Sequence, residues 1–193
     1  MKKFRFAILG AGHIARQFCD AVSRIDGCEV CAVASKSLAR AENFAKENGV
    51  ESYYDDYETL LEKERPDCAY IAVTPNDHYR LSVLCVNHSV PVLCEKAMFQ
   101  NSEEAKNLYA LASEKKIFIM EALWSRYLPA VQQVKRWVEQ EKIGKPTVLQ
   151  CNIGFLAPDE KENRYFNPKL GGGVAKDITV YAYEITTFIL NQV

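Results

Sequence analysis

The sequence predicts an α/β protein with a doubly wound parallel sheet, followed by the beginning of a second, α+β domain. Short apolar segments alternate with segments of helical periodicity through the first two-thirds of the 193 residues. The apolar segments are continuous, which is typical of strands that are covered on both faces. Near Trp124 the alternation ends, and a helix, a long strand and a final helix follow. We therefore expect domains at 1–124 and 125–193.

The expected strands of the first domain are short and end where polar or glycine residues begin. Asp56 and Ser102 are the expected N-caps of two helices, because their side-chain oxygens can accept hydrogen bonds from the first helical N–H groups. In chain order, strands are expected at 4–10, 28–34, 52–54, 68–74, 91–94 and 117–121, and helices at 13–24, 37–49, 56–64, 77–88 and 102–116. In the second domain we expect a helix at 128–142, a strand at 147–155 and a helix at 174–190.

The composition is that of a globular protein and argues against several classes of partner. Hydrophobic residues make up 48% of the chain and charged residues 25%, with a formal net charge of -1, so nothing favours nucleic acid. No apolar run approaches the roughly 20 residues of a membrane span. The N-terminus has neither the apolar core nor the small-residue cleavage site of a signal peptide, so we do not expect one. Seven cysteines in apolar patterns fit thiols in a reducing cytoplasm. Cys28 and Cys31 lie three apart on a strand and would point to opposite faces, so no metal site is expected.

A glycine-rich turn follows the first strand. The stretch "AILGAGHIA" carries Gly10, Gly12 and Ala15 in the G-x-G-x-x-A pattern, between a buried strand and a helix. Gly10 permits the tight turn, and Gly12 lets the backbone approach a pyrophosphate. His13 and Ile14 open the helix, whose N-terminal N–H groups would face the phosphates. The pattern predicts a dinucleotide site of the Rossmann type, with a tight turn that binds no ligand as the alternative.

The end of the second strand indicates which nicotinamide cofactor is bound. An acid at this position would bind the ribose 2′-hydroxyl of NAD. Here Ser35 and Lys36 stand in its place, and Arg40 follows one turn into the next helix. A hydroxyl and two cations suit a 2′-phosphate, so we expect NADP rather than NAD. The alternative is an ordinary solvated helix start.

The loop after the fourth strand leaves the sheet at the same edge. Thr74, Pro75 and Asn76 lie where the loops at the carboxyl ends of parallel strands meet their ligand. We expect these residues to contact the cofactor. His78, just inside the next helix, is grouped with them, with a structural role as the alternative.

An acid and a base end the fifth strand in the stretch "VLCEKA". Glu95 and Lys96 therefore also emerge at the ligand edge. A lysine that is shielded from water beside a cationic nicotinamide could exchange protons near neutral pH. The alternative is a surface ion pair, which contributes little to stability. We expect Glu95 and Lys96 to contact the cofactor.

Five motifs together resemble one known family. The stretches "AILGAGHIA", "TPNDHY", "VLCEKA", "EALWSRYLPA" and "NPKLGGGVAKDITVYAYE" have the order and approximate spacing of the glucose–fructose oxidoreductase / inositol dehydrogenase (Gfo/Idh/MocA) family. The resemblance extends over essentially the whole chain and is greatest to the dihydrodiol dehydrogenase-like branch. It implies a Rossmann domain followed by a substrate domain, of which we expect only a part here.

The resemblance also implies a function. It implies an NAD(P)-dependent oxidoreductase that transfers a hydride between the nicotinamide and a polyol, sugar or dihydrodiol, and that forms a homo-oligomer. With the residues after the second strand, the expected function is that of an NADP-dependent oxidoreductase. Lys96 corresponds to the catalytic lysine of the family, and Asp177 and Tyr181 correspond to its acid and tyrosine. Their i, i+4 spacing would put both on one helical face. Trp124 and Arg126 resemble residues near the nicotinamide and the substrate.

The chain departs from the family pattern at several positions. Ala97 stands where many members have proline after the lysine. Lys176 and Thr179, on either side of Asp177, replace an apolar residue and a glycine. The alternative function is therefore an NADP-binding protein without turnover.

Overall fold

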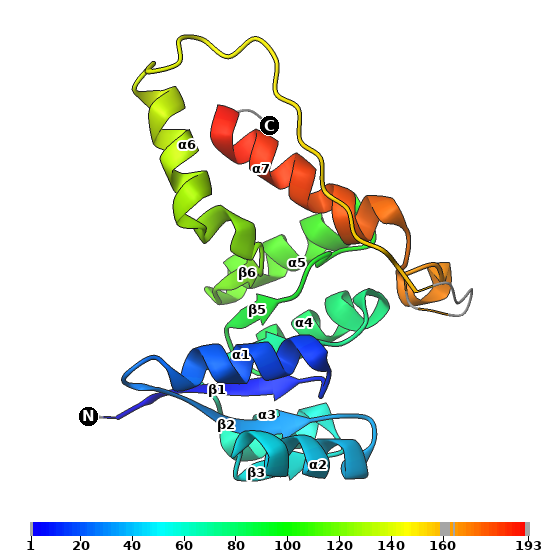
Figure 1. Ribbon diagram of the computed structural model, residues 1–193. Coiled ribbons are helices and arrows are strands. Elements are labelled where there is room, and N and C mark those ends of the chain that lie inside the picture. Colours follow the sequence, from blue (N-terminus) through cyan, green and yellow to red (C-terminus); the bar gives the residue numbers. More distant parts are fainter. Residues whose placement is uncertain (1, 159–162, 164, 192–193) are drawn as a thin grey trace. The chain divides into compact units, whose positions relative to one another are not determined.

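The computed structural model describes residues 2–158, 163 and 165–191, and the chain forms two compact units, Met1–Glu121 and Ala122–Val193 (Figure 1). The division between the units follows Glu121, which is the last residue of strand β6 (Ile119–Glu121). No helix among the described residues is long and apolar enough to cross a membrane.

The first unit contains one six-stranded sheet in which every pairing is parallel. The strand order is β3-β2-β1-β4-β5-β6, so the chain winds outward from the centre in both directions and the switch point lies between β1 and β4. This order confirms the predicted doubly wound class. The strands are β1 (Phe4–Leu9), β2 (Cys28–Ala34), β3 (Ser52–Tyr54), β4 (Cys68–Ile71), β5 (Val92–Cys94) and β6 (Ile119–Glu121).

Helices cover both faces of this sheet (Figure 1). Leu60, Leu81 and Leu108 belong to three helices (α3, α4 and α5) that share one core cluster with alternate residues of the strands. On the other face, Phe18 of α1 stacks on Tyr70 of β4, with ring centroids 3.9 Å apart. The helices are α1 (His13–Ser23), α2 (Leu38–Asn48), α3 (Tyr57–Glu64), α4 (His78–Asn87) and α5 (Ser102–Lys115).

The helix caps confirm one expectation and correct another. The Asp56 carboxylate accepts a hydrogen bond of 2.7 Å from the Thr59 N–H, as predicted for an N-cap. Ser102 does not cap α5. The residue before it, Asn101, accepts from the N–H groups of Glu103 and Glu104 at 3.0 and 2.9 Å. The extended backbone of Asn101 lets its amide oxygen reach two helical donors, and Ser102 is already inside the helix.

The described part of the second unit is built from helices and irregular chain. A 3₁₀ turn at Trp124–Tyr127 precedes α6 (Pro129–Glu139), and a π-helical turn at Ala175–Thr179 leads into α7 (Val180–Leu190). A short 3₁₀ turn lies at Pro168–Leu170.

The strand expected at 147–155 is wrong. The described residues of this stretch have irregular backbone and pair with no strand. Val148 is 84% exposed, and the neighbouring Leu156 is 98% exposed. Apolar, β-branched residues favour a strand, but a strand also needs a partner for its N–H and C=O groups. Sequence periodicity does not supply that partner.

Candidate functional site

The glycine turn after β1 is shaped by its contact with the end of β4. Gly10 has φ +113°, a conformation that other residues rarely adopt. A Cβ at this position would lie 2.6 Å from the Ala72 carbonyl oxygen and 2.9 Å from the Val73 nitrogen. Only glycine therefore lets the turn pass against β4.

Gly12 is different, because the surrounding chain does not require a glycine at this position. Its φ of -104° is open to most residues, and an added Cβ would meet only the Ala72 oxygen, at 3.8 Å. The space in front of its Cα is what a side chain would fill. A closely approaching ligand such as a pyrophosphate fits this space.

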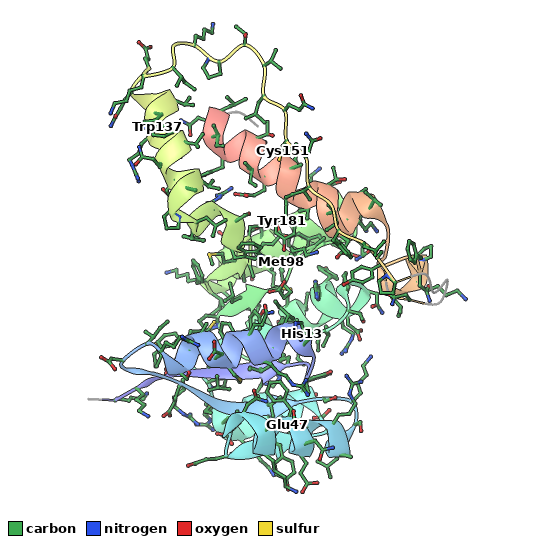
Figure 2. The ribbon with its side chains drawn as sticks, in the orientation of Figure 1. His13, Glu47, Met98, Trp137, Cys151 and Tyr181 are labelled. Carbon is green, nitrogen blue, oxygen red and sulfur yellow. The ribbon has the colours of Figure 1, made fainter. Side chains whose placement is uncertain are left out.

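The helix that follows this turn presents its N-terminus to the same place. Within the described residues, α1 has no side-chain cap and no acidic residue in its first turn. The first N–H groups and the helix dipole therefore favour an anion. His13 is the first helical residue and is exposed, with its Nε2 atom 3.2 Å from the side-chain nitrogen of Gln17 (Figure 2). Ile14 is half-buried beside it. The turn and the helix fit a dinucleotide phosphate.

The three residues expected at the 2′-phosphate differ in their exposure to solvent. Ser35 is only 5% exposed, and its N–H donates to the Tyr54 oxygen at 3.1 Å, which extends the pairing of β2 with β3. Lys36 and Arg40 are both on the surface. The two cations therefore remain the accessible members of the group.

Lys36 has a partner that the sequence patterns did not indicate. Its ammonium lies 2.6 Å from the Asp77 carboxylate, which also accepts from Arg80 at 3.2 Å. Burial alone would raise the pKa of Asp77, but the hydrogen bonds and charges of Lys36 and Arg80 hold it below its ordinary value. The sequence patterns did not predict Asp77 or Arg80 as residues of the site. The charges of "NDHYR" at the end of the same loop were the signal that could have found them.

The loop after β4 is a short 3₁₀ turn. Thr74 and Pro75 are half-buried, Asn76 is exposed, and the Thr74 oxygen accepts from the Asp77 N–H at 3.0 Å. The exposed amide of Asn76 leaves it available to a ligand at this edge.

His78 has a different environment from the cofactor contact that we expected. Its ring is fully buried, with Nδ1 2.8 Å from the Ala97 oxygen and Nε2 3.0 Å from the Val73 oxygen. Because both nitrogens face backbone carbonyls, the side chain supports two loops and is not presented to a ligand. A neutral imidazole has one N–H and donates to one of these oxygens at a time. Burial lowers the pKa of His78 and favours this neutral form.

Glu95 and Lys96 follow β5, as predicted, and both are half-buried. The Tyr70 hydroxyl donates to the Glu95 carboxylate at 2.6 Å. Burial raises the pKa of Glu95, against the opposing effects of Tyr70 and Lys96. The peptide bond between Lys96 and Ala97 is cis. The acid is therefore tied to the sheet, and the base occupies the edge beside it.

Glu121, the last residue of β6, was not singled out from the sequence. Its carboxylate accepts from the Met98 N–H at 2.8 Å and so holds the chain that follows Lys96. The sequence signal that could have found Glu121 is an acid at the carboxyl end of a strand. Glu121 supports the lysine loop from the neighbouring strand.

In the second unit, the structure brings Trp124 and Tyr181 together. The indole N–H donates to the Tyr181 hydroxyl at 3.0 Å, and the two rings meet edge to face. Glu184, which we had not expected, is 3% exposed and accepts from Ser125 at 2.9 Å and from Arg126 at 2.7 Å. This buried carboxylate fastens the 3₁₀ turn that carries Trp124 to α7.

Asp177 lies in the π-helical turn, and its N–H donates to the Gly173 oxygen at 3.0 Å. The i, i+4 argument that paired it with Tyr181 assumed a regular α-helix, and this assumption was wrong. A π turn has i→i+5 hydrogen bonds and alters the angular spacing of its side chains. Lys176 and Thr179, two of the three departures from the family pattern, lie in the same turn.

A cavity of about 440 Å³ lies at the opposite edge of the sheet, where β1 and β2 begin. Its lining includes Arg5 and Glu64, which pair with each other at 2.7 Å, and the free thiols Cys28 and Cys31. In the described residues no group of three or more His, Cys, Asp or Glu side chains is placed to hold a metal ion. The glycine turn and the uncapped helix favour the carboxyl edge as the cofactor site, because the first N–H groups of α1 can donate to a phosphate there.

Comparisons with known proteins match both units of the chain. The GFO_IDH_MocA family model, described as an oxidoreductase family with an NAD-binding Rossmann fold, matches residues 4–123. A C-terminal domain model of the same family matches 131–193. The trans-1,2-dihydrobenzene-1,2-diol dehydrogenase of Mus musculus is 33% identical over 187 residues, which are 96% of this chain and 56% of the relative. The same enzyme of Danio rerio is 30% identical over 97% of this chain and 56% of the relative.

A solved structure gives the same fold. An oxidoreductase from Agrobacterium radiobacter, in complex with NAD+, L-tartaric acid and magnesium, has a TM-score of 0.82 at 23% identity. The match covers 98% of this chain and 55% of that chain. The chain thus spans about half the length of the curated relatives and of the structure that it matches.

Proposed function

Because the chain belongs to the Gfo/Idh/MocA oxidoreductase family, we propose that it binds NADP at the turn after β1 and serves hydride transfer to or from a CH–OH group. The observation that carries this proposal is the space at Gly12 in front of an uncapped helix N-terminus. The proposed substrate is a polyol, sugar or dihydrodiol. The support for this class comes from the relatives at 30–33% identity, which are named as dehydrogenases of a dihydrodiol.

The residues of the first unit have separate tasks in this proposal. The first N–H groups of α1 hold the pyrophosphate, and Lys36 and Arg40 attract the 2′-phosphate. Asn76 offers an exposed amide to the nicotinamide half of the cofactor. His78 and Glu121 keep the loops after β4 and β5 in place through backbone carbonyls and a backbone N–H.

Three residues have catalytic roles in this proposal: Lys96, Asp177 and Tyr181. When bound, the nicotinamide supplies the hydride chemistry, and the protein places the groups around it. We assign Tyr181 as the group that takes the hydroxyl proton in oxidation and returns it in reduction, and Lys96 as the cation that favours this exchange. The Trp124 N–H fixes the direction of the Tyr181 hydroxyl. Asp177 is proposed to orient the substrate or Lys96.

Binding to the full chain is the first test. Titration calorimetry and thermal melting with NADP and with NAD should show binding of NADP and a higher melting temperature. At one hundred times the dissociation constant, a ligand of the folded state alone stabilises by about 2.7 kcal/mol. A melting temperature that neither nucleotide changes, with no heat of binding, would contradict the proposal.

Turnover is the second test. NADPH absorbance should change with one or more members of a panel of sugars, polyols and trans-dihydrodiols. Lys96→Ala should lower the rate at least roughly a hundredfold while most of the NADP affinity remains. Lys106→Ala, which removes an exposed lysine from α5, is the matched control and should leave the rate unchanged. Equal rates for Lys96→Ala and wild type would remove Lys96 from the mechanism.

An NADP-binding protein without turnover is the second candidate function. The observation in its favour is the π-helical turn, which places Lys176 and Thr179 on either side of Asp177 where the family has an apolar residue and glycine. Binding of NADP without any change in absorbance across the panel would favour this candidate.

We also propose that the protein is a cytoplasmic homo-oligomer. Seven free thiols suit a reducing compartment. In the second unit, Tyr127 is 63% exposed and Val148 is 84% exposed, and apolar side chains of this kind commonly mark association surfaces. Light scattering after size-exclusion chromatography would measure the oligomeric state.

A further inference from the structure

Three charged side chains form a cluster at the carboxyl edge of the sheet, which we call the Asp77 clasp: Lys36, Asp77 and Arg80. Lys36 follows β2, whereas Asp77 and Arg80 follow β4. The Lys36 ammonium is 2.6 Å from one carboxylate oxygen of Asp77, and the Arg80 Nε atom is 3.2 Å from the other. The carboxylate thus joins two loops that are 41 residues apart in the sequence.

The position of the clasp follows from the strand order. β1 lies between β2 and β4, so a contact between the loops after β2 and β4 spans the end of β1, where the glycine turn begins. A dinucleotide whose pyrophosphate rests on that turn places its adenosine ribose near the end of β2. The clasp therefore adjoins the part of the cofactor that distinguishes NADP from NAD.

The members of the clasp differ in their freedom to move. The Lys36 side chain is 69% exposed, whereas that of Asp77 is 16% exposed. Tyr57, which is 8% exposed, lies close enough to Lys36, Asp77 and Arg80 for all three charges to act on its hydroxyl. The Asp77 side chain is therefore largely buried and paired with Arg80. The exposed Lys36 side chain is flexible, so it is the member of the clasp that can change its partner.

We propose that Asp77 is a specificity-determining residue that weakens the preference for NADP over NAD by competing with the 2′-phosphate for Lys36. The inference rests on the proposed NADP function. A 2′-phosphate is an anion with strong acceptor oxygens, and it attracts the lysine most when no carboxylate is bound there already. NAD has a neutral hydroxyl at this position and does not compete for the ammonium. Removing the Asp77 charge should favour NADP selectively.

Asp77→Asn tests the proposal by titration calorimetry on the full chain at low ionic strength, with NADP and NAD as ligands. Asparagine keeps the size of the side chain and removes its charge. The affinity for NADP should increase roughly threefold to tenfold, and that for NAD should change by less than about twofold. The increase should shrink as salt is added, because the interaction is exposed to solvent.

Asp20→Asn is the matched control. Asp20 is an exposed aspartate on α1 that pairs with Arg24 at 2.9 Å, so its replacement removes the same charge from the same kind of ion pair. It should leave both affinities unchanged. A second control is the Lys36→Met background, in which Asp77→Asn should lose most of its effect because the competition acts through the lysine.

The outcomes separate the inference from the proposed function. If wild type binds NADP and Asp77→Asn leaves the ratio of the two affinities unchanged, the inference is wrong and the function stands. Weaker binding of NAD by Asp77→Asn, without a gain for NADP, would assign Asp77 to the ribose hydroxyls and also overturn the inference. If neither nucleotide binds wild type or the variant, the proposed function fails, and the inference fails with it.

Discussion

Replacing Gly10 by alanine should destabilise the first unit because the turn after β1 has no room for a methyl group. The added Cβ would lie 2.6 Å from the Ala72 oxygen and 2.7 Å from the Ala72 carbon. These are backbone atoms at the end of β4, so the clash cannot be relieved by a side-chain rotation. The residue would also keep φ near +113°, which alanine adopts only with strain.

The magnitude follows from these two effects. A non-glycine residue in a sparsely populated backbone region costs about 2 kcal/mol. Relief of the clash requires β1 and β4 to separate at their carboxyl ends, where the Ala72 N–H donates to the Leu9 oxygen at 2.8 Å. Loss of one such hydrogen bond adds about 1 kcal/mol. The free energy of unfolding should therefore fall by about 3 kcal/mol, a large part of the 5–15 kcal/mol of a typical domain.

Urea denaturation followed by circular dichroism measures this change. With a slope near 2 kcal/mol per molar, the midpoint should fall by about 1.5 M. Gly12→Ala is the matched control, because its Cβ meets only the Ala72 oxygen at 3.8 Å and its φ is ordinary. It should keep the stability of wild type within about 0.5 kcal/mol and lose NADP affinity instead. A Gly10→Ala protein with the wild-type midpoint would refute the steric argument, and a Gly12→Ala protein with wild-type affinity would refute the assigned phosphate position.

Two further predictions concern buried polar groups that hold the site. His78→Asn should lower the free energy of unfolding by about 2 kcal/mol, because the Ala97 and Val73 oxygens lose a donor in a buried place. Because burial puts the folded-state pKa of His78 below 6.5, its unfolded state binds more protons, so stability should rise with pH through the window just below 6.5. Urea titrations from pH 5 to 7.5 on wild type and variant would measure how the free energy of unfolding changes with pH. If the same pH dependence persists in His78→Asn, a group other than His78 causes it. Glu184→Gln should cost about 1–2 kcal/mol and loosen the turn that carries Trp124, because the Arg126 guanidinium loses its anion. Its readout is Trp124 fluorescence in a Trp137→Phe background, and an unchanged spectrum and melting temperature would argue against the fastening role.

The sequence alone determined the architecture of the first unit. Each strand carries its own apolar run and each helix its own periodicity, and these local patterns suffice to order the elements. The glycine turn and the lysine after β5 were also predictable, because a parallel sheet gathers every loop that follows a strand at one edge. The Asp56 cap was predictable for the same local reason, since a cap involves only neighbours along the chain.

Only the tertiary structure decided which groups face one another across that edge. Asp77 and Lys36 are 41 residues apart, and no periodicity relates them. From the sequence, Glu121 and Glu184 looked like ordinary surface charges, and only their hydrogen bonds show which backbone and side-chain donors they satisfy. The expected strand at 147–155 does not form, and the reason is again a partner that is distant in the sequence. A helix closes its hydrogen bonds within its own segment, whereas a strand depends on a partner elsewhere in the chain, and local sequence does not specify that partner.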